Sequence, residues 1–289
     1  MTTKDATRTD IYTRITNQIV AYLEVGVKPW TQPWQSAGGT VSRPLRHNGE
    51  PYAGINVLTL WCSSMERGFN SSTWMTFKQA LQLGGAVRKG EKGSPVVFAS
   101  SMTKTEENSS TGEEQERKIP FLKSYTVFNV EQIDGLPERF GERAEIIVNS
   151  DERVAHAEIF FAATGALIRH GGDRAFYAPG PDLIQMPHFE AFRDAQSYYA
   201  TLAHEATHWT SHKTRLDRSF DQKRFGDDGY AREELVAELG AAFLCADLGI
   251  TLKQRTDHAD YLGFWLKVLK EDKRAIFSAA AHAQRAIEF

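Results

Sequence analysis

The stretch His204-Glu205-Ala206-Thr207-His208 constrains this chain more than any other. Residues four apart lie on the same face of an α-helix, so the two histidines can direct ring nitrogens at one metal ion. Glu205 is then placed to take a proton from an attacking water, as in the H-E-x-x-H zinc hydrolases. The surrounding sequence suits a helix, because neither Pro nor Gly occurs between Phe189 and His212. We therefore predict a metal site on a helix, with Glu205 as its general base.

A catalytic zinc site needs a third protein ligand and one open position. The acidic stretch Glu233–Glu238 opens an apolar helix that is predicted to run to about Asp247. Glu234 and Glu238 lie four residues apart and share one helix face. We assign Glu234 as the third ligand and Glu238 as the acceptor of the other ring N–H of a ligand histidine. The reverse assignment stays open, as does Mn²⁺ in place of the expected Zn²⁺.

The segment after the first helix is basic and carries a third histidine. His212 lies one more turn along, and three ligands from one helix are geometrically awkward, so we interpret it as a helix-end cation. Together with Tyr230, it is also a candidate oxyanion donor. The nearby cations are interpreted as solubilising residues of a loop: Arg215, Arg218, Lys223 and Arg224.

The length of 289 residues allows one large domain or two ordinary ones, and the composition is that of a soluble globular protein. The sequence has no apolar run of membrane-spanning length, and its polar N-terminus lacks the hydrophobic segment of a secretory signal. We expect a cytoplasmic protein without membrane contact. Cys62 and Cys245 are expected to be reduced packing residues.

The net charge of −3 argues against a strongly basic nucleic-acid-binding protein, but the charge is unevenly distributed. Residues 1–140 carry 16 Lys and Arg against 14 Asp and Glu, whereas the remainder carries 18 against 23. Five of the N-terminal acids fall in the stretch Thr103–Lys118. The basic excess of the N-terminal part gives modest support to nucleic-acid binding.

The N-terminal part is predicted to be α+β, with helices around a small antiparallel sheet. The expected helices are Ile11–Leu23, Ile55–Arg67 and Thr76–Leu83, and the expected strands are Pro95–Phe98 and Phe121–Val130. Between the strands, Thr103–Lys118 has the composition of a mobile hairpin tip.

Aromatic and basic residues interleave through this part of the chain. Bases of a single strand can stack on exposed rings while cations follow the phosphates. The alternative is that the rings belong to the core, as most aromatic residues do. The candidate DNA-binding residues are Trp30, Trp34, Arg43, Arg46, Tyr52, Trp74, Arg88, Lys89 and Lys92, with Phe98 in the same pattern.

We predict three segments: a DNA-binding domain (1–135), a linker (136–149) and a metallopeptidase lobe (150–289). The lobe is expected to begin with a helix from about Asp151 to Ala163, followed by short extended pieces and the H-E-x-x-H helix. Leu183–Met186 is expected to be the edge strand that could pair with an extended peptide. Two closing helices are expected to pack against this lobe.

Several longer stretches resemble one known family, the ArdC plasmid antirestriction proteins, and the N-terminal part of TraC-type plasmid primases. The matching stretches include Pro29-Trp30, Tyr52–Asn56, Trp74–Phe77, Val87–Gly93, Ile184–Pro187, His204–Thr210 and Tyr230–Glu238. The resemblance implies a single-stranded-DNA-binding domain joined to a zincin-like metallopeptidase domain. It also implies protection of incoming plasmid DNA from host restriction during conjugation, with restriction-modification proteins as further partners. Zincins with a glutamate ligand often have Asp or Asn four residues later, where this chain has Glu238.

Two other functions remain open at the level of sequence. The chain could be a regulatory metallopeptidase that cleaves a repressor or a restriction-system protein. It could also be a non-enzymatic DNA shield or decoy with a structural metal. Glu205 favours the peptidase, because a structural site has no use for a base, but zincin lobes can be retained as scaffolds.

Overall fold

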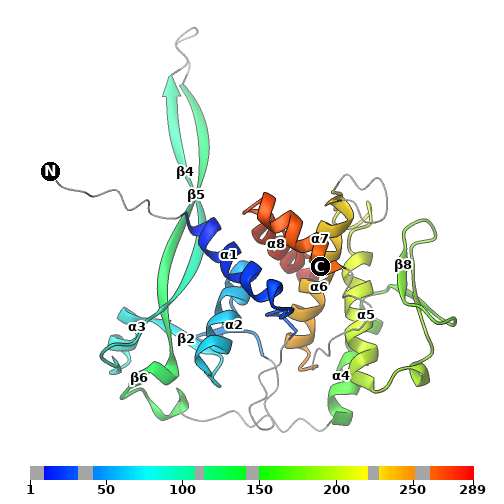
Figure 1. Ribbon diagram of the computed structural model, residues 1–289, viewed down its shortest axis with the longest axis horizontal. Helices are drawn as coiled ribbons and strands as arrows, with labels where there is room; N and C mark the ends of the chain where they lie inside the picture. Colours follow the sequence, from blue (N-terminus) through cyan, green and yellow to red (C-terminus); the bar gives the residue numbers. More distant parts are fainter. Residues whose placement is uncertain (1–9, 32–41, 108–113, 141–149, 221–227, 251–260) are drawn as a thin grey trace.

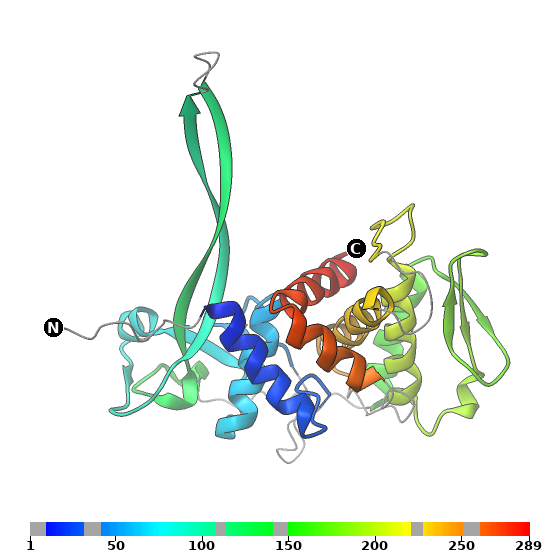
Figure 2. The ribbon, with the colours of Figure 1, turned by 45° about the horizontal axis from the view of Figure 1, so that its top comes forward.

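The computed structural model describes residues 10–31, 42–107, 114–140, 150–220, 228–250 and 261–289. A helical body carries a long two-stranded arm on one side and a small sheet on the other (Figures 1 and 2). The architecture is α+β, as predicted.

The N-terminal sheet has the strand order β1-β2-β5-β4. Its strands are β1 (Leu45–Arg46), β2 (Thr73–Thr76), β4 (Ser94–Glu107) and β5 (Glu114–Asn129). The β1–β2 pair is parallel, and the other pairs are antiparallel. A separate short antiparallel pair joins β3 (Ala86–Val87) to β6 (Ile133–Asp134). The accompanying helices are α1 (Ile11–Glu24), α2 (Ile55–Arg67) and α3 (Phe77–Gln82).

Helix α3 shows how local sequence sets an element boundary. The Thr76 hydroxyl accepts a hydrogen bond from the Gln79 N–H at 3.2 Å, and the Gln79 side chain accepts one from the Thr76 N–H at 2.8 Å. This reciprocal capping box satisfies backbone donors that have no partner within the helix. The helix predicted for Thr76–Leu83 is confirmed within one residue at each end.

The arm is longer than the sequence predicted. Strands β4 and β5 pair continuously from Ser94 opposite Val127 to Glu107 opposite Glu114. The predicted hairpin is present, but its strands continue through most of the stretch Thr103–Lys118 that was predicted to be the tip, and residues 108–113 lie outside the described residues. Backbone pairing in a ladder does not require apolar side chains, so a polar composition does not end the strands.

The C-terminal sheet has the strand order β7-β9-β8, with strands β7 (Leu167–His170), β8 (Phe176–Ala178) and β9 (Leu183–Met186). Strand β9 is central, pairing in parallel with β7 and antiparallel with β8. The prediction that Leu183–Met186 forms the edge is therefore wrong. Leu183, Ile184 and Met186 are all buried, as expected for a strand with both faces covered.

The remaining elements are η1 (Val130–Gln132), η2 (Glu138–Phe140), α4 (Ser150–Ala163), η3 (Phe189–Ala191), α5 (Ala195–Trp209), α6 (Asp228–Asp247), α7 (Tyr261–Glu271) and α8 (Ala275–Glu288). Asp194 caps α5, accepting a hydrogen bond from the Ser197 N–H at 2.8 Å. Helix α5 packs against α6, and α6 packs against α7 and α8.

The main core joins the two halves of the chain. It combines Leu23, Leu58 and Trp61 of the N-terminal helices with Phe243 of α6 and Trp265 of α7. Helix α7 packs on α1, and α8 on α2, so the closing helices contact both predicted domains. Of the predicted linker, residues 141–149 lie outside the described residues. Helix α6 therefore contacts both halves of the chain.

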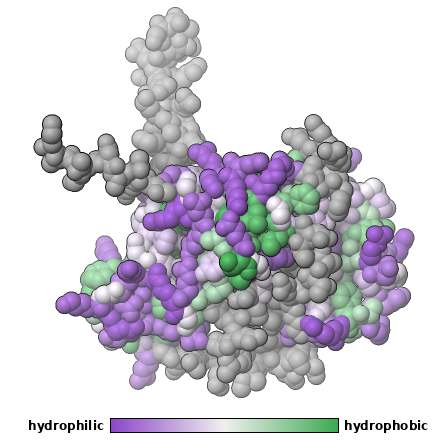
Figure 3. Space-filling view, in the orientation of Figure 1, coloured by the Kyte–Doolittle hydropathy of each residue, from purple (hydrophilic) through white to green (hydrophobic). Residues whose placement is uncertain are grey.

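Among the described residues, no helix combines the length and the apolar composition needed to cross a bilayer. On the face shown in Figure 3, the described residues are mostly hydrophilic, with a hydrophobic area near the centre of the view.

Close contact between α5 and α6 depends on Gly240. A Cβ atom at this position would lie 2.5 Å from Thr207 Cγ2. Because Thr207 is β-branched and its hydroxyl donates to the Ala203 carbonyl at 2.8 Å, it has little freedom to move aside. Glycine therefore allows α6 to approach the helix that carries the two histidines.

We expect Gly240→Ala to lower the free energy of unfolding by about 1–3 kcal/mol, because overpacking outweighs the better helix propensity of alanine. Gly263→Ala in α7 is the matched control, since a Cβ there meets nothing within 4 Å. That control should be neutral or stabilising by up to about 1 kcal/mol. Chemical denaturation measures both variants, and equal stability of the two would contradict the packing argument.

Candidate metal centre

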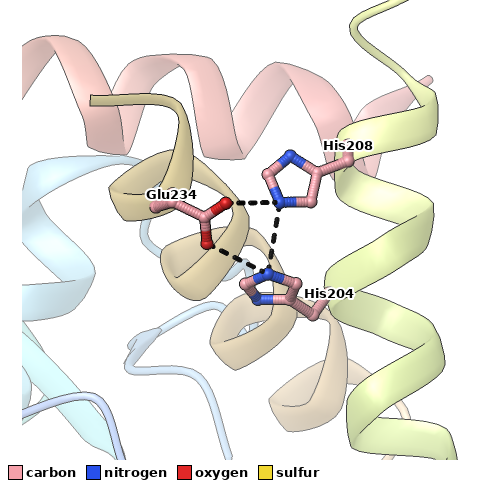
Figure 4. Close-up of side chains that lie close together, drawn as sticks. All are labelled: His204, His208 and Glu234. Carbon is pink, nitrogen blue, oxygen red and sulfur yellow. Dashed lines mark hydrogen bonds and ion pairs between the residues drawn. The ribbon is translucent and has the colours of Figure 1, made fainter. Parts of the chain in front are cut away.

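Helices α5 and α6 bring three predicted ligands together (Figure 4). The Nε2 atoms of His204 and His208 lie 3.2 Å apart. Each lies 3.5 Å from a different carboxylate oxygen of Glu234. The three side chains are 5%, 15% and 9% exposed, respectively, so the site is almost closed to bulk water.

The donor set fits a divalent metal ion. Two imidazole nitrogens and one carboxylate oxygen are the protein ligands of many catalytic zinc sites. Metal–ligand bonds of about 2.0–2.1 Å place tetrahedral ligands roughly 3.3 Å apart. The observed separations of 3.2 and 3.5 Å match this spacing. The three ligands leave a fourth position for water or substrate.

The site is strongly polarised. Burial alone would raise the pKa of Glu234, but His208 and His204 lower that pKa below its ordinary value. Burial alone would lower the pKa of His208, but Glu234 and Glu233 raise it to about 10. In the metal-free chain, a proton on His208 therefore balances the carboxylate, and a bound cation would take its place.

A buried ion pair behind His208 was not anticipated from the sequence. Oε1 of Glu233 lies 3.1 Å from His208 Nδ1, and Arg218 donates to the two Glu233 oxygens at 2.7 and 2.8 Å. Arg218 also donates to the Thr207 carbonyl at 2.8 Å and to the Thr210 hydroxyl at 3.1 Å. The interpretation of Arg218 as a solubilising residue is therefore wrong. This pair fixes the orientation of the ring and directs Nε2 into the metal site.

Glu238 contacts residues of the N-terminal half of the chain, and its assignment as acceptor of a ligand histidine N–H stays a prediction. The residue that faces Nδ1 of His208 is Glu233, which directly precedes the predicted ligand Glu234. Glu238 is buried, and its Oε2 accepts a hydrogen bond from Trp30 Nε1 at 3.4 Å and lies 3.9 Å from Lys28 Nζ. Two residues of the N-terminal half thus reach the helix that carries Glu234.

Glu205 is buried on α5 directly after His204. Of the two oxyanion candidates, Tyr230 lies beside Glu234, and its hydroxyl is 3.0 Å from that of Tyr261. Burial together with Tyr261 and Glu234 raises the pKa of Tyr230, which keeps its hydroxyl protonated and able to donate. His212 lies in the turn after α5, with Nδ1 2.8 Å from the Thr214 hydroxyl.

Several candidate DNA-binding residues are buried. Trp30, Tyr52 and Trp74 are only 3%, 8% and 0% exposed, so they cannot offer ring faces to a base in this conformation. Trp30 packs edge-on against Trp265, which explains its burial. Their prediction as stacking residues is corrected accordingly. Trp34 lies outside the described residues.

The basic candidates divide into buried and exposed groups. Arg43 is buried, donating to Asp247 at 3.0 Å and to Gln284 at 2.6 Å, so it joins parts of the chain rather than facing a ligand. The exposed candidates are Arg46, Arg88, Lys89 and Lys92. Arg46 pairs with Glu50, and Arg88 with Glu91 and Asp134.

This fold and site define a zincin-like metallopeptidase lobe joined to a distinct N-terminal α+β region. Residues 155–282 match the model of a zincin-like metallopeptidase family, MPTase-PolyVal. Residues 9–128 match the N-terminal domain of anti-restriction factor ArdC. The chain belongs to the ArdC family of antirestriction proteins.

Relatives cover nearly the whole chain. The uncharacterized protein y4eC of Sinorhizobium fredii is 41% identical over 285 residues, which cover 96% of this chain and 91% of that protein. DNA primase TraC of Escherichia coli is 40% identical over 291 residues, which cover 96% of this chain but 26% of the primase. The chain therefore corresponds to about a quarter of that longer relative.

Two crystal structures of the antirestriction protein ArdC from the R388 plasmid are similar to this one. The metal-free form has a TM-score of 0.80 at 48% identity, and the Mn(II)-bound form a TM-score of 0.77 at 47% identity. Each comparison covers 96% of both chains. Together with the zincin-like domain, the Mn(II)-bound relative supports a divalent metal as the cofactor class.

Proposed function

We propose that this chain protects incoming plasmid DNA from host restriction during conjugation, binding single-stranded DNA and hydrolysing peptide bonds at a zinc centre. The observation that carries the enzymatic part is the convergence of His204, His208 and Glu234 next to buried Glu205. A purely structural metal does not require a carboxylate base beside its ligands. Membership of an antirestriction family supports the biological role, and the relative named a DNA primase supports DNA as a partner.

The chain's own residues account for the proton transfers of peptide hydrolysis. Glu205 takes a proton from the attacking water and then gives it to the departing amine. Tyr230 can donate its hydroxyl hydrogen to the oxygen that becomes negative. The Arg218–Glu233 pair holds His208 in place throughout. When bound, the zinc ion would supply Lewis acidity toward the scissile carbonyl and the water.

The biological role can be tested by conjugation. A plasmid carrying the gene and a plasmid lacking it are transferred into matched restricting and non-restricting recipients. We expect the gene to raise transfer only into the restricting recipient, because protection matters only where a nuclease is present. An equal effect in both recipients would indicate a role in transfer itself and would contradict antirestriction.

The peptidase part requires a separate assay. Purified protein is incubated with restriction-enzyme subunits, with and without single-stranded DNA, and the products are separated by mass. New fragments that depend on added zinc support a peptidase that acts on these partners. Intact subunits alongside full protection in the conjugation assay would support the shield or decoy.

A further inference from the structure

Both faces of the arm contribute to the main core where the arm leaves the body. Residues alternate between the faces of a strand, and directly opposed residues share a face. Val97 lies opposite Ser124, and Ala99 opposite Leu122. Val97 and Leu122 both pack with the main core. Val96 and Val127, on the other face, are also buried in that core, so the arm is packed on both faces where it leaves the body.

Beside buried Val96, the same face presents two aromatic rings and a cation to solvent. Phe98 lies directly opposite Lys123, and Tyr125 lies opposite Val96, one step closer to the body. Phe98 is 55% and Tyr125 46% exposed, and Lys123 is also exposed. Diagonal neighbours on adjacent strands lie about 7–8 Å apart, within reach of aromatic side chains. We call Phe98, Lys123 and Tyr125 the arm patch.

The composition of the arm patch is unusual for the solvent face of a two-stranded arm. The solvent-exposed positions of an antiparallel pair normally carry polar residues. Here two adjacent exposed positions instead carry aromatic rings, while Trp30, Tyr52 and Trp74 are buried in the body. Figures 1 and 2 show the arm projecting away from the helices, so a long ligand can run across it.

We propose that the arm patch is a binding surface for single-stranded DNA. Bases stack on Phe98 and Tyr125, and Lys123 contacts the phosphate between them. Single-stranded nucleic acid matches this combination, because its bases expose ring faces and its backbone is anionic. In duplex DNA, the bases are already stacked on one another. The proposal rests on the single-stranded-DNA binding of the proposed function and assigns its location.

The test uses the full chain and a fluorescently labelled oligothymidine, with affinity measured by anisotropy at two salt concentrations. The variants are Phe98→Ala, Tyr125→Ala and Lys123→Gln. Phe77→Ala is the matched control: Phe77 is 52% exposed in the same half of the chain, but it packs near Phe128, on the opposite face of β5. Thermal unfolding and gel filtration of every variant report folding and self-association.

We expect each ring variant to weaken binding about tenfold, and Lys123→Gln to weaken it less while reducing the salt dependence. Phe77→Ala should bind like the unchanged chain. Unchanged affinity in both ring variants would overturn the location. A ring variant that changes the oligomeric state without changing the DNA affinity would also overturn the location. If the unchanged chain itself does not bind the oligonucleotide, the proposed DNA-binding function fails, which is a separate result.

Discussion

Replacing Glu205 by glutamine is expected to reduce peptide hydrolysis by about 10²–10⁴-fold, the usual contribution of a positioned general base. Glutamine preserves the shape of the side chain but cannot accept the proton of the attacking water. Because Glu205 is neither a predicted ligand nor part of the arm patch, metal content and single-stranded-DNA affinity should not change. Cleavage of labelled unfolded casein, metal analysis and anisotropy measure the three properties.

The matched control is Glu190→Gln, which neutralises an exposed glutamate just before α5. It should leave all three properties unchanged. Hydrolysis that survives Glu205→Gln at the normal rate would exclude this residue as the base.

Glu205→Gln also separates the two function classes, peptidase and DNA shield, in the conjugation assay. If the variant lowers transfer only into the restricting recipient, protection depends on peptide cleavage. If the variant protects fully, DNA binding alone is sufficient for protection.

Replacing His204 and His208 together by alanine is expected to remove the metal and destabilise the fold. The unchanged chain should hold one zinc ion, because the structure brings together one set of ligands among the described residues. With free metal at about 100 times its dissociation constant, the lost binding alone would cost about 2.7 kcal/mol. Elemental analysis and thermal unfolding with and without a chelator measure the two effects.

His212→Ala is the control for this experiment, because His212 lies outside the ligand cluster. It should keep the metal. Full metal content in the double variant would show that the site assignment is wrong. In the unchanged chain, metal affinity should rise with pH toward about 10, because the metal must displace the proton of His208, whose pKa Glu234 and Glu233 raise to about 10. Metal-free stability has the opposite dependence: the contribution of protonated His208 is complete below the ordinary histidine pKa and is lost as pH rises through about 10.

The clustering of the three predicted ligands follows from short-range sequence patterns. His204 and His208 share a helix face because of their spacing, and that geometry holds in any fold that keeps the helix. Glu234 could be proposed because it lies on an apolar helix whose buried side must face another element. The choice between Glu234 and Glu238 was not fixed by spacing, since both lie on one face. The packing of α6 on α5 places Glu234, among the described residues, within reach of both histidines.

The surroundings of the site depended on contacts between distant parts of the chain. From the sequence, Arg218 was interpreted as a surface cation. In the structure, the turn after α5 places it in the interior, where it forms an ion pair with Glu233. Lys28 and Trp30 lie more than 200 residues from Glu238 in the sequence and still contact it. The hydrophobic periodicity of a single segment cannot predict such contacts between distant residues.

The sequence by itself determined the helices with capping signals, the α+β class and the His–Glu–His arrangement, because these depend on neighbours within a few residues. Tertiary structure alone decided that Trp30 and Trp74 are core residues while Phe98 and Tyr125 face solvent. It also decided that β9 is a central strand and that the arm continues through a polar stretch. The reason is physical: an aromatic ring is buried by whichever distant surface packs against it, and a strand is central when both neighbours pair with it.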